Sequence, residues 1–180
     1  NCICGPNDDV MIPRDSTTLD WALEIAFVVG KRARYVDLKD AKSHIAGYTI
    51  CNDVSERAFQ MERGGQWMKG KCAETFGPLG PWLVTADEVK DVNNLTMSLD
   101  LNGKRAQSGS TNTMIFKCDF ILHYLSQFMV LEPGDVVTTG TPPGVGLGMK
   151  PPTFLKAGDV MKLTIEGLGT QQQKVVPFKL

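Results

Sequence analysis

The segment WALEIAFVVGK (residues 21–31) is almost entirely apolar and contains a single carboxylate, Glu24. Its length and its β-branched and aromatic residues are typical of a buried β-strand. Side chains alternate along a strand, so Glu24 shares a face with Ala22 and Ala26. A carboxylate on such a face has to reach water, a cation or a hydrogen-bond donor. Glu24 is therefore either an edge-strand residue that points to solvent or a functional group.

Further strand signals surround this segment. Residues 95–101 alternate apolar and polar side chains, and Asn102-Gly103 follows them, which predicts a type I′ hairpin. The remaining strands are expected within residues 47–53, after a rigid Gly- and Pro-rich turn at 76–84, and within 135–148 and 158–169. The helices do not alternate with the strands in a βαβ rhythm. The sequence thus predicts an α+β, β-rich fold with mixed, rolled or barrel-like sheets.

Two helices are expected. A short one starts after Asp37, as N-cap, and stops at Gly47. The stronger pattern lies within residues 116–135 and ends at Pro133-Gly134. Its apolar stripe comprises Ile121, Leu122, Leu125, Phe128 and Met129.

Composition limits the classes of protein. The 180 residues have a net charge of −1 and no long basic run, which argues against a nucleic-acid partner or an anionic membrane surface. No apolar stretch approaches the ~20 residues that cross a bilayer. The length corresponds to one domain, residues 1–180.

The five cysteines are odd in number and scattered, which indicates reduced thiols and a reducing compartment. Cys2 and Cys4 lie on one side of an extended segment, but neither His44 nor His123 has a ligand-like spacing to them, so zinc is not expected. The chain begins at Asn1 with no signal or capped helix before it, and we expect an N-terminal segment to be missing.

Three polar features are candidates for chemistry. Asp53 ends a predicted strand, although an Asx-turn or a helix N-cap explains it equally well. Lys71 lies beside a rigid turn and can present its ammonium to an anion or simply to water. Residues 138–148 lack the Gly-Lys-Ser/Thr ending of a phosphate loop and the dinucleotide fingerprint, and indicate a loop that a ligand can approach closely.

Taken together, four motifs carry a resemblance. They are GYTxxNDxSxRxxQ (47–60), GKxxxTFGPLGP (70–81), PGDVxxTGTPPGVG (133–146) and FLKxGD (154–159). In this order, across residues 5–176, the chain resembles the fumarylacetoacetate hydrolase family. It is most similar to members that act on acylpyruvates and small 2,4-diketo acids, sugar-acid hydrolases among them.

The resemblance implies a mixed β-roll of the family's C-terminal domain type and a divalent cation, Mg²⁺ or Mn²⁺, held by three carboxylates. Two of these come from a Glu-x-Glu on one strand and the third from the Asp of the Asn-Asp motif. On matching positions, the metal ligands are Glu24 and Asp53, and the catalytic and substrate-contacting residues are Arg57, Gln60 and Lys71. The substrate carboxylate is held by Gly140 and Thr141.

The chain departs from the family pattern at several positions that bear on metal and substrate binding. Ala22 stands where the first glutamate of the pair is expected, so we expect a large loss of metal affinity, even an empty site. Glu74 replaces an aspartate and Ser110 an asparagine. The family's general base, a His with a nearby Glu on an upstream GxNYxxHxxE segment, has no counterpart in this chain.

The resemblance therefore predicts a metal-dependent hydrolase that cleaves a C–C bond in a small 2,4-diketo acid through a metal-stabilised enolate. Two alternatives stay open: an isomerase or decarboxylase of a related 2-oxo acid, and a catalytically impaired relative that lacks one metal ligand. The partners expected are the oxo acid and a second copy of the chain, as a homodimer. The expected location is the cytoplasm or, alternatively, the mitochondrial matrix.

Overall fold

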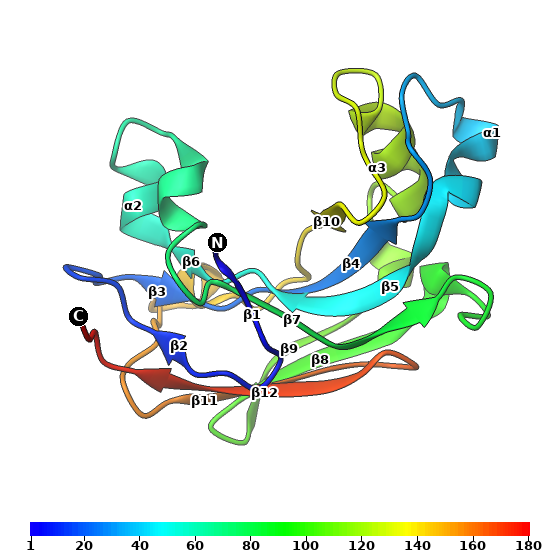
Figure 1. The fold of residues 1–180 in the computed structure, drawn as a ribbon. Coiled ribbons are helices and arrows are strands. Elements are labelled where there is room, and N and C mark those ends of the chain that lie inside the picture. The colour runs from blue at the N-terminus through cyan, green and yellow to red at the C-terminus, as the bar shows by residue number, and fades with distance from the viewer.

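Two five-stranded sheets and one two-stranded ladder form the β structure of the chain, in a computed structural model that describes residues 1–180 (Figure 1). The first sheet has the order β1 (Ile3–Cys4), β7 (Gly77–Thr85), β5 (Ile45–Asn52), β4 (Leu23–Val29), β10 (Val136–Thr138). The second has the order β2 (Val10–Met11), β12 (Gly169–Val176), β11 (Val160–Ile165), β8 (Thr96–Leu101), β9 (Lys104–Ser110). The ladder joins β3 (Leu19–Asp20) to β6 (Ser55–Glu56).

The helical segments are short. The α-helices are α1 (Leu38–Ala41), α2 (Arg57–Met61) and α3 (Cys118–Leu125). The 3₁₀ turns are η1 (Lys42–His44), η2 (Trp67–Gly70), η3 (Val92–Asn94), η4 (Thr111–Thr113) and η5 (Gly146–Gly148). Figure 1 shows α2 and α3 rising at opposite ends of the molecule, on the side of the first sheet away from β11 and β12. No helix has the length and apolar character needed to cross a membrane.

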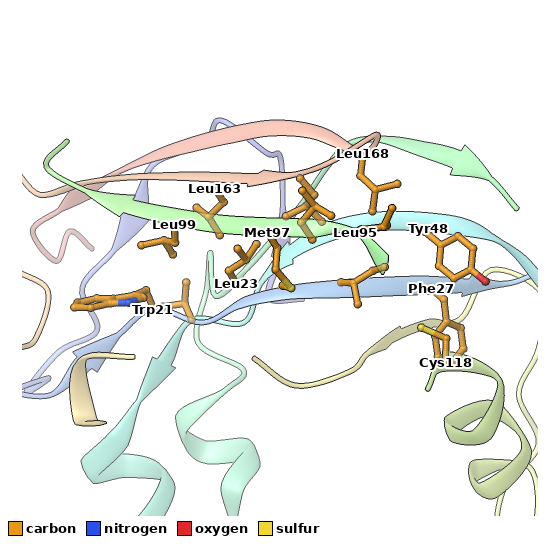
Figure 2. Packing of buried hydrophobic residues seen from close by; sticks show 14 of the residues in the cluster. Trp21, Leu23, Phe27, Tyr48, Leu95, Met97, Leu99, Cys118, Leu163 and Leu168 are labelled. Carbon is orange, nitrogen blue, oxygen red and sulfur yellow. The ribbon is translucent and has the colours of Figure 1, made fainter. Parts of the chain in front are cut away.

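The hydrophobic core is a cluster of 27 buried residues that lies between the two sheets and continues to α3, through Cys118 and Leu122. Figure 2 shows Leu23, Met97, Leu99 and Leu163 between β4 and the second sheet, with Tyr48 at the end nearest α3. Burial of such apolar surface is the main favourable contribution to folding, and it aligns β4 across the middle of the molecule.

Strand β4 is central rather than at an edge, since it pairs with β5 on one side and β10 on the other. Glu24, at 4% exposure, is buried. The interpretation of Glu24 as a solvent-facing edge residue is therefore wrong.

The predicted hairpin is confirmed. Asn102 and Gly103, with φ of 51° and 76°, both adopt the left-handed conformation that a type I′ turn requires. They connect β8 to β9, which pair antiparallel.

The expected start of the first helix is confirmed, since Asp37 is the N-cap of α1, but the expected ends of both helices are wrong, for tertiary reasons. α1 ends at Ala41 and the 3₁₀ turn η1 continues to His44. Gly47 is not a helix stop but part of β5, where a Cβ would lie 2.2 Å from the carbonyl oxygen of Val84 in the neighbouring strand. The second stops at Leu125. There the Ser126 carbonyl accepts from the Tyr35 N–H at 2.8 Å, which ties the chain to the segment before α1.

Two segments have a different secondary structure from the one expected from the sequence. Phe128 and Met129, expected on the helical stripe, lie beyond α3 and are largely exposed. Residues 76–84, expected to be a turn before a strand, lie almost wholly within β7. Their Gly and Pro residues coincide with a register shift in the β5–β7 ladder between Tyr48 and Ile50, which is the irregularity that such residues favour in strands.

Candidate active site

A pocket of about 360 Å³ opens on the side of β4 that carries Glu24, and 10 residues line it. It brings together every site residue that the resemblance assigned, from segments far apart in the sequence. These are Glu24, Asp53, Arg57, Gln60, Lys71, Gly140 and Thr141, with Ala22, Trp67 and Thr138 completing the lining. The geometric grouping of these residues is thus observed.

Strand pairing positions the two carboxylates. Glu24 is opposite Cys51 in the β4–β5 ladder, and Asp53 follows β5 by one residue. The Asp53 N–H donates to the carbonyl oxygen of Ala22 at 2.9 Å. Position 22 therefore lies directly beside Asp53 and two residues from Glu24 on the same side of the chain. The alternating geometry of one strand and the end of the next brings these three positions together.

The environment of Glu24 is unfavourable for its charge. Burial, and secondly the nearby charge of Asp53, raise the pKa of Glu24 to about 7. The Gly140 N–H, which donates to Oε2 of Glu24 at 2.7 Å, and the Lys71 ammonium oppose this shift only in part. A cation in the pocket would favour the ionised form.

Asp53 has a cationic partner. The Lys71 ammonium donates a hydrogen bond to Oδ2 of Asp53, and both side chains are 22% exposed. Asp53 does not cap a helix: the N-cap of α2 is Glu56, which accepts from the Ala58 N–H at 3.0 Å. The N-cap interpretation of Asp53 is wrong.

Glu56 is itself a buried carboxylate that anchors α2. Burial would raise its pKa, but hydrogen bonds from Ser16, Thr18 and Ala58 outweigh burial and lower it. These bonds fix the start of α2 to residues 16–18, and thereby fix the helix that carries two residues of the pocket. Figure 1 shows α2 standing beside β3 and β6.

Arg57 and Gln60 lie on α2 and touch each other. The Arg57 Nε donates to Oδ2 of Asp20 at 2.9 Å, and an Nη donates to Oε1 of Gln60 at 3.2 Å. Asp20 is fully buried. Sequence reasoning missed Asp20, although it directly precedes the apolar segment 21–31; the structure places it in β3, outside β4.

Thr141 is held from two sides. Its hydroxyl donates to the carbonyl oxygen of Leu23 at 2.7 Å and accepts from Nε2 of Gln107 at 2.8 Å. Gln107 is fully buried and also accepts from the Leu23 N–H at 3.0 Å. Sequence reasoning missed Gln107, because it lies in a polar hairpin strand with no local signal. The Thr141 hydroxyl has to leave Leu23 before it can donate to a ligand.

Other candidates lie elsewhere. Lys69, two residues before Lys71, donates to the carbonyl oxygen of Arg63 at 2.7 Å, and Glu74 does not line the pocket. Ser110 lines a neighbouring pocket instead. The rings of His44 and His123 hydrogen-bond to the carbonyl oxygens of Lys31 and Val36, outside the pocket.

The donor set of the pocket meets the needs of a divalent cation only in part. Glu24 and Asp53 offer hard oxygen ligands, and Mg²⁺ commonly uses one or two protein carboxylates with water and ligand oxygens for the rest. Residues 1–180 contain no group of three or more His, Cys, Asp or Glu side chains arranged for a metal. At position 22 the pocket wall is a methyl group. The site fits a cation in kind but has one carboxylate fewer than the family pattern.

The pocket combines two carboxylates with a lysine and an arginine, a set of side chains in which both signs of charge meet in one concave site. A family model described as "Fumarylacetoacetate (FAA) hydrolase C-terminal" matches residues 1–176, and the chain belongs to the fumarylacetoacetate hydrolase family. The predicted family and the predicted β-rich fold are confirmed. Members of this family are enzymes, hydrolases and isomerases among them, and generally use divalent metal ions.

Three similar proteins illustrate the relationship. A protein of Burkholderia cenocepacia (strain HI2424), named as a hydrolase, is 55% identical over 173 residues, which are 96% of this chain and 61% of that protein. The fumarylacetoacetate hydrolase of the psychrophile Exiguobacterium antarcticum has a TM-score of 0.94 and 40% identity, covering 98% of this chain and 64% of that one. The 5-carboxymethyl-2-hydroxymuconate delta-isomerase of Mycobacterium smegmatis has a TM-score of 0.89 and 36% identity, covering 99% and 67%. The chain thus spans less than two thirds of the first two relatives.

Proposed function

We propose that the chain is the catalytic domain of a metal-dependent hydrolase that cleaves a C–C bond in a small 2,4-diketo acid of the acylpyruvate type. One observation carries the proposal: the Glu24–Asp53 pair shares a pocket with Lys71 and Arg57. This combination suits a ligand with a carboxylate and an adjacent carbonyl. Family membership supports the reaction class but leaves the substrate open.

In this proposal the side chains have separate roles. Arg57, supported by Gln60, binds the substrate carboxylate, because a guanidinium binds planar anions through paired N–H groups. The backbone of Gly140 and the hydroxyl of Thr141 orient the same end of the substrate. Lys71 has three N–H donors and uses one on Asp53, which leaves two to stabilise the negative charge that develops on the departing enolate.

Glu24 and Asp53 would hold the cation, for which we propose Mg²⁺ or Mn²⁺. The bound ion would supply a Lewis acid for the substrate carbonyl. In the hydrolysis, water adds to the acyl carbonyl, the C–C bond breaks, and its electron pair remains on the 2-oxo acid as an enolate. Protonation of the enolate gives pyruvate, and the other product is a carboxylic acid.

One observation favours the second candidate, an isomerase or decarboxylase of a related 2-oxo acid. The 10 pocket residues include no histidine that could activate water. Isomerisation and decarboxylation use the same enolate stabilisation without an attacking water. The delta-isomerase among the structural relatives supports the isomerase candidate.

Ala22 favours the third candidate, a catalytically impaired relative. Its carbonyl is bonded to the Asp53 N–H, so the backbone at position 22 is placed for a ligand that the methyl side chain does not provide. The remaining pocket residues are those of the family pattern, which favours a retained ability to bind the oxo acid.

We further propose that the chain forms a homodimer. A row of four aromatic side chains runs along α3. Its ring centroids are 4.9 Å apart for Phe116–Phe120 and 5.0 Å apart for Tyr124–Phe128. Phe128 is 69% exposed. Contiguous exposed aromatic surface is typical of interfaces. Sedimentation of the double variant F116S/F128S is expected to show a monomer where the unaltered chain shows a dimer. A monomeric unaltered chain would contradict the proposal.

The relatives are bacterial, which favours a bacterial cytoplasm over a mitochondrial matrix.

The test of function is an assay of acetylpyruvate cleavage and oxaloacetate decarboxylation with Mg²⁺, for the unaltered chain and for Ala22→Glu. We expect the substitution to raise turnover in one of the two assays and Lys71→Met to abolish that gain. If neither substrate is turned over by either protein, and neither binds Mg²⁺, the hydrolase and decarboxylase proposals are both wrong. Binding of the oxo acid without turnover would support the impaired relative.

A further inference from the structure

The buried carboxylate of Asp20 has a contact pattern that the proposed chemistry does not use. Asp20 ends β3 and is 0% exposed. Its Oδ1 accepts from the N–H groups of Trp21 at 2.8 Å and Gly146 at 2.7 Å. Its Oδ2 accepts from the Leu147 N–H at 3.0 Å and from the Arg57 Nε at 2.9 Å. All its partners are therefore donors, and no other acidic group competes for them.

These bonds distribute the charge of Asp20. Three of its four partners are backbone N–H groups, which stabilise a carboxylate without being cations. The Arg57 guanidinium is consequently one partner among several, and much of its positive charge remains available to a ligand. Gly146 is required for this arrangement, because a Cβ there would lie 1.9 Å from the Thr153 carbonyl oxygen and 2.8 Å from Oδ1 of Asp20.

The Arg57 guanidinium has donors left over for a ligand. Of its five N–H groups, one bonds to Asp20 and one to Gln60. The side chain is 12% exposed, it lines the pocket, and no buried side-chain polar atom of the chain lacks a partner. A guanidinium nitrogen without a partner is therefore not buried, and Arg57 lines the pocket, so a ligand there can reach it. The bonds to Asp20 and Gln60 fix the guanidinium from two sides.

We propose that Asp20 is a positioning residue: it fixes the Arg57 guanidinium in the orientation that binds the carboxylate of the oxo acid, and links that orientation to the Gly146–Leu147 segment. This inference rests on the proposed binding of a 2-oxo acid. An arginine without such a partner samples many rotamers, and ordering them on binding lowers affinity. Asp20 orders Arg57 before the ligand arrives.

The first experiment measures ligand binding. The probe is oxalate, a stable planar analogue of the pyruvate enolate, titrated calorimetrically with and without Mg²⁺. Asp20→Asn keeps the shape of the side chain but places an amide N–H₂ among donors, and we expect it to weaken oxalate binding about tenfold. Asp100→Asn is the matched control, because Asp100 also accepts from an arginine Nε, that of Arg105, on an exposed hairpin. We expect no change for it.

A double-mutant cycle separates positioning from a structural role. Arg57→Met removes the guanidinium, and we expect the double variant D20N/R57M to bind oxalate no more weakly than R57M alone. Additive losses would show that Asp20 acts through the Gly146–Leu147 segment and not through Arg57, and would overturn the inference.

A second measurement needs no ligand, and its decisive part uses only the unaltered protein. In a ¹H–¹⁵N spectrum of the unaltered protein, the Arg57 Nε–H is expected to be resolved and slow to exchange with water, and this signal is expected to be lost in D20N. An Arg57 signal that exchanges as fast as the exposed arginines would overturn the inference. If oxalate does not bind the unaltered chain at all, the proposed function fails, while this spectrum still decides whether Asp20 orders Arg57.

Discussion

Replacement of Ala22 by glutamate is the perturbation that most directly addresses the metal site. Position 22 is beside Asp53, since the Asp53 N–H donates to the Ala22 carbonyl oxygen at 2.9 Å, and it lines the same pocket as Glu24. A glutamate at position 22 would be a third carboxylate around one point of the pocket. We expect the variant to bind Mg²⁺ or Mn²⁺ more tightly than the unaltered chain does.

The magnitude follows from opposing electrostatic contributions. Two unit charges 4 Å apart interact by about 4 kcal/mol at an effective dielectric constant of 20, so a carboxylate and a divalent ion gain roughly 8 kcal/mol. Desolvation of the new carboxylate and of the ion offsets several kcal/mol of this gain. A net gain of about 2–3 kcal/mol corresponds to roughly 30- to 150-fold tighter binding.

The assay is calorimetric titration of MgCl₂ and MnCl₂ into the metal-free protein. Ala22→Gln is the matched control, because it has the same size without the charge. In EDTA, A22E is expected to melt at a lower temperature than A22Q, since three carboxylates then repel one another, and added Mg²⁺ is expected to reverse the order. Equal Mg²⁺ affinity of A22E and A22Q would refute the reasoning. Tight binding by the unaltered chain would show that Ala22 does not impair the site.

Three further predictions concern buried polar groups. Glu24→Gln should stabilise the metal-free protein at pH 8 by about 3 kcal/mol, at about 1.4 kcal/mol per pKa unit, and should have no such effect at pH 4. The sign follows because the folded pKa of about 7 is raised, so the cost of ionising Glu24 grows as the pH rises from its unfolded value towards 7; urea unfolding at the two pH values measures it. Glu56→Gln should destabilise the folded protein by about 2–3 kcal/mol at pH 7. Because the folded pKa of Glu56 is lowered, this difference in unfolding free energy should shrink as the pH falls below the unfolded pKa. A pH-independent difference would contradict the assigned hydrogen bonds. Gln107→Met should lower the free energy of unfolding by about 2–3 kcal/mol, because it leaves the Leu23 N–H unpaired. It should also weaken oxalate binding, because it releases Thr141. Unchanged binding by a folded variant would show that Gln107 does not orient Thr141.

Much of the local structure could be predicted from sequence. The strand at Leu23–Val29 follows from its apolar, β-branched composition, and the hairpin at Asn102-Gly103 follows from residues that accept positive φ. The family motifs also located every pocket residue that the resemblance assigned. The helix ends were misplaced because contacts distant in sequence decide them. α3, for example, ends where the Ser126 carbonyl bonds to the Tyr35 N–H, 91 residues earlier in the chain, and no local pattern encodes such a contact.

The candidate site divides in the same way. Glu24 was conspicuous because a lone carboxylate in an apolar strand needs a partner, whereas Gln107 and its role beside Thr141 left no trace in the sequence. Asp20 bonds to Gly146 across 126 residues, and Gln107 to Leu23 across 84. Such partners become neighbours only when the sheets pack.

The amino-acid sequence by itself determined the β-rich composition, the turn chemistry and the residue types of the site, because alternation and turn propensity act over a few residues. The tertiary structure alone decided that β4 is central, that Glu24 is buried beside Asp53, and that Asp20 orders Arg57. Those properties depend on which strands pair and on what excludes water from the pocket, and both are set by contacts between segments distant along the chain.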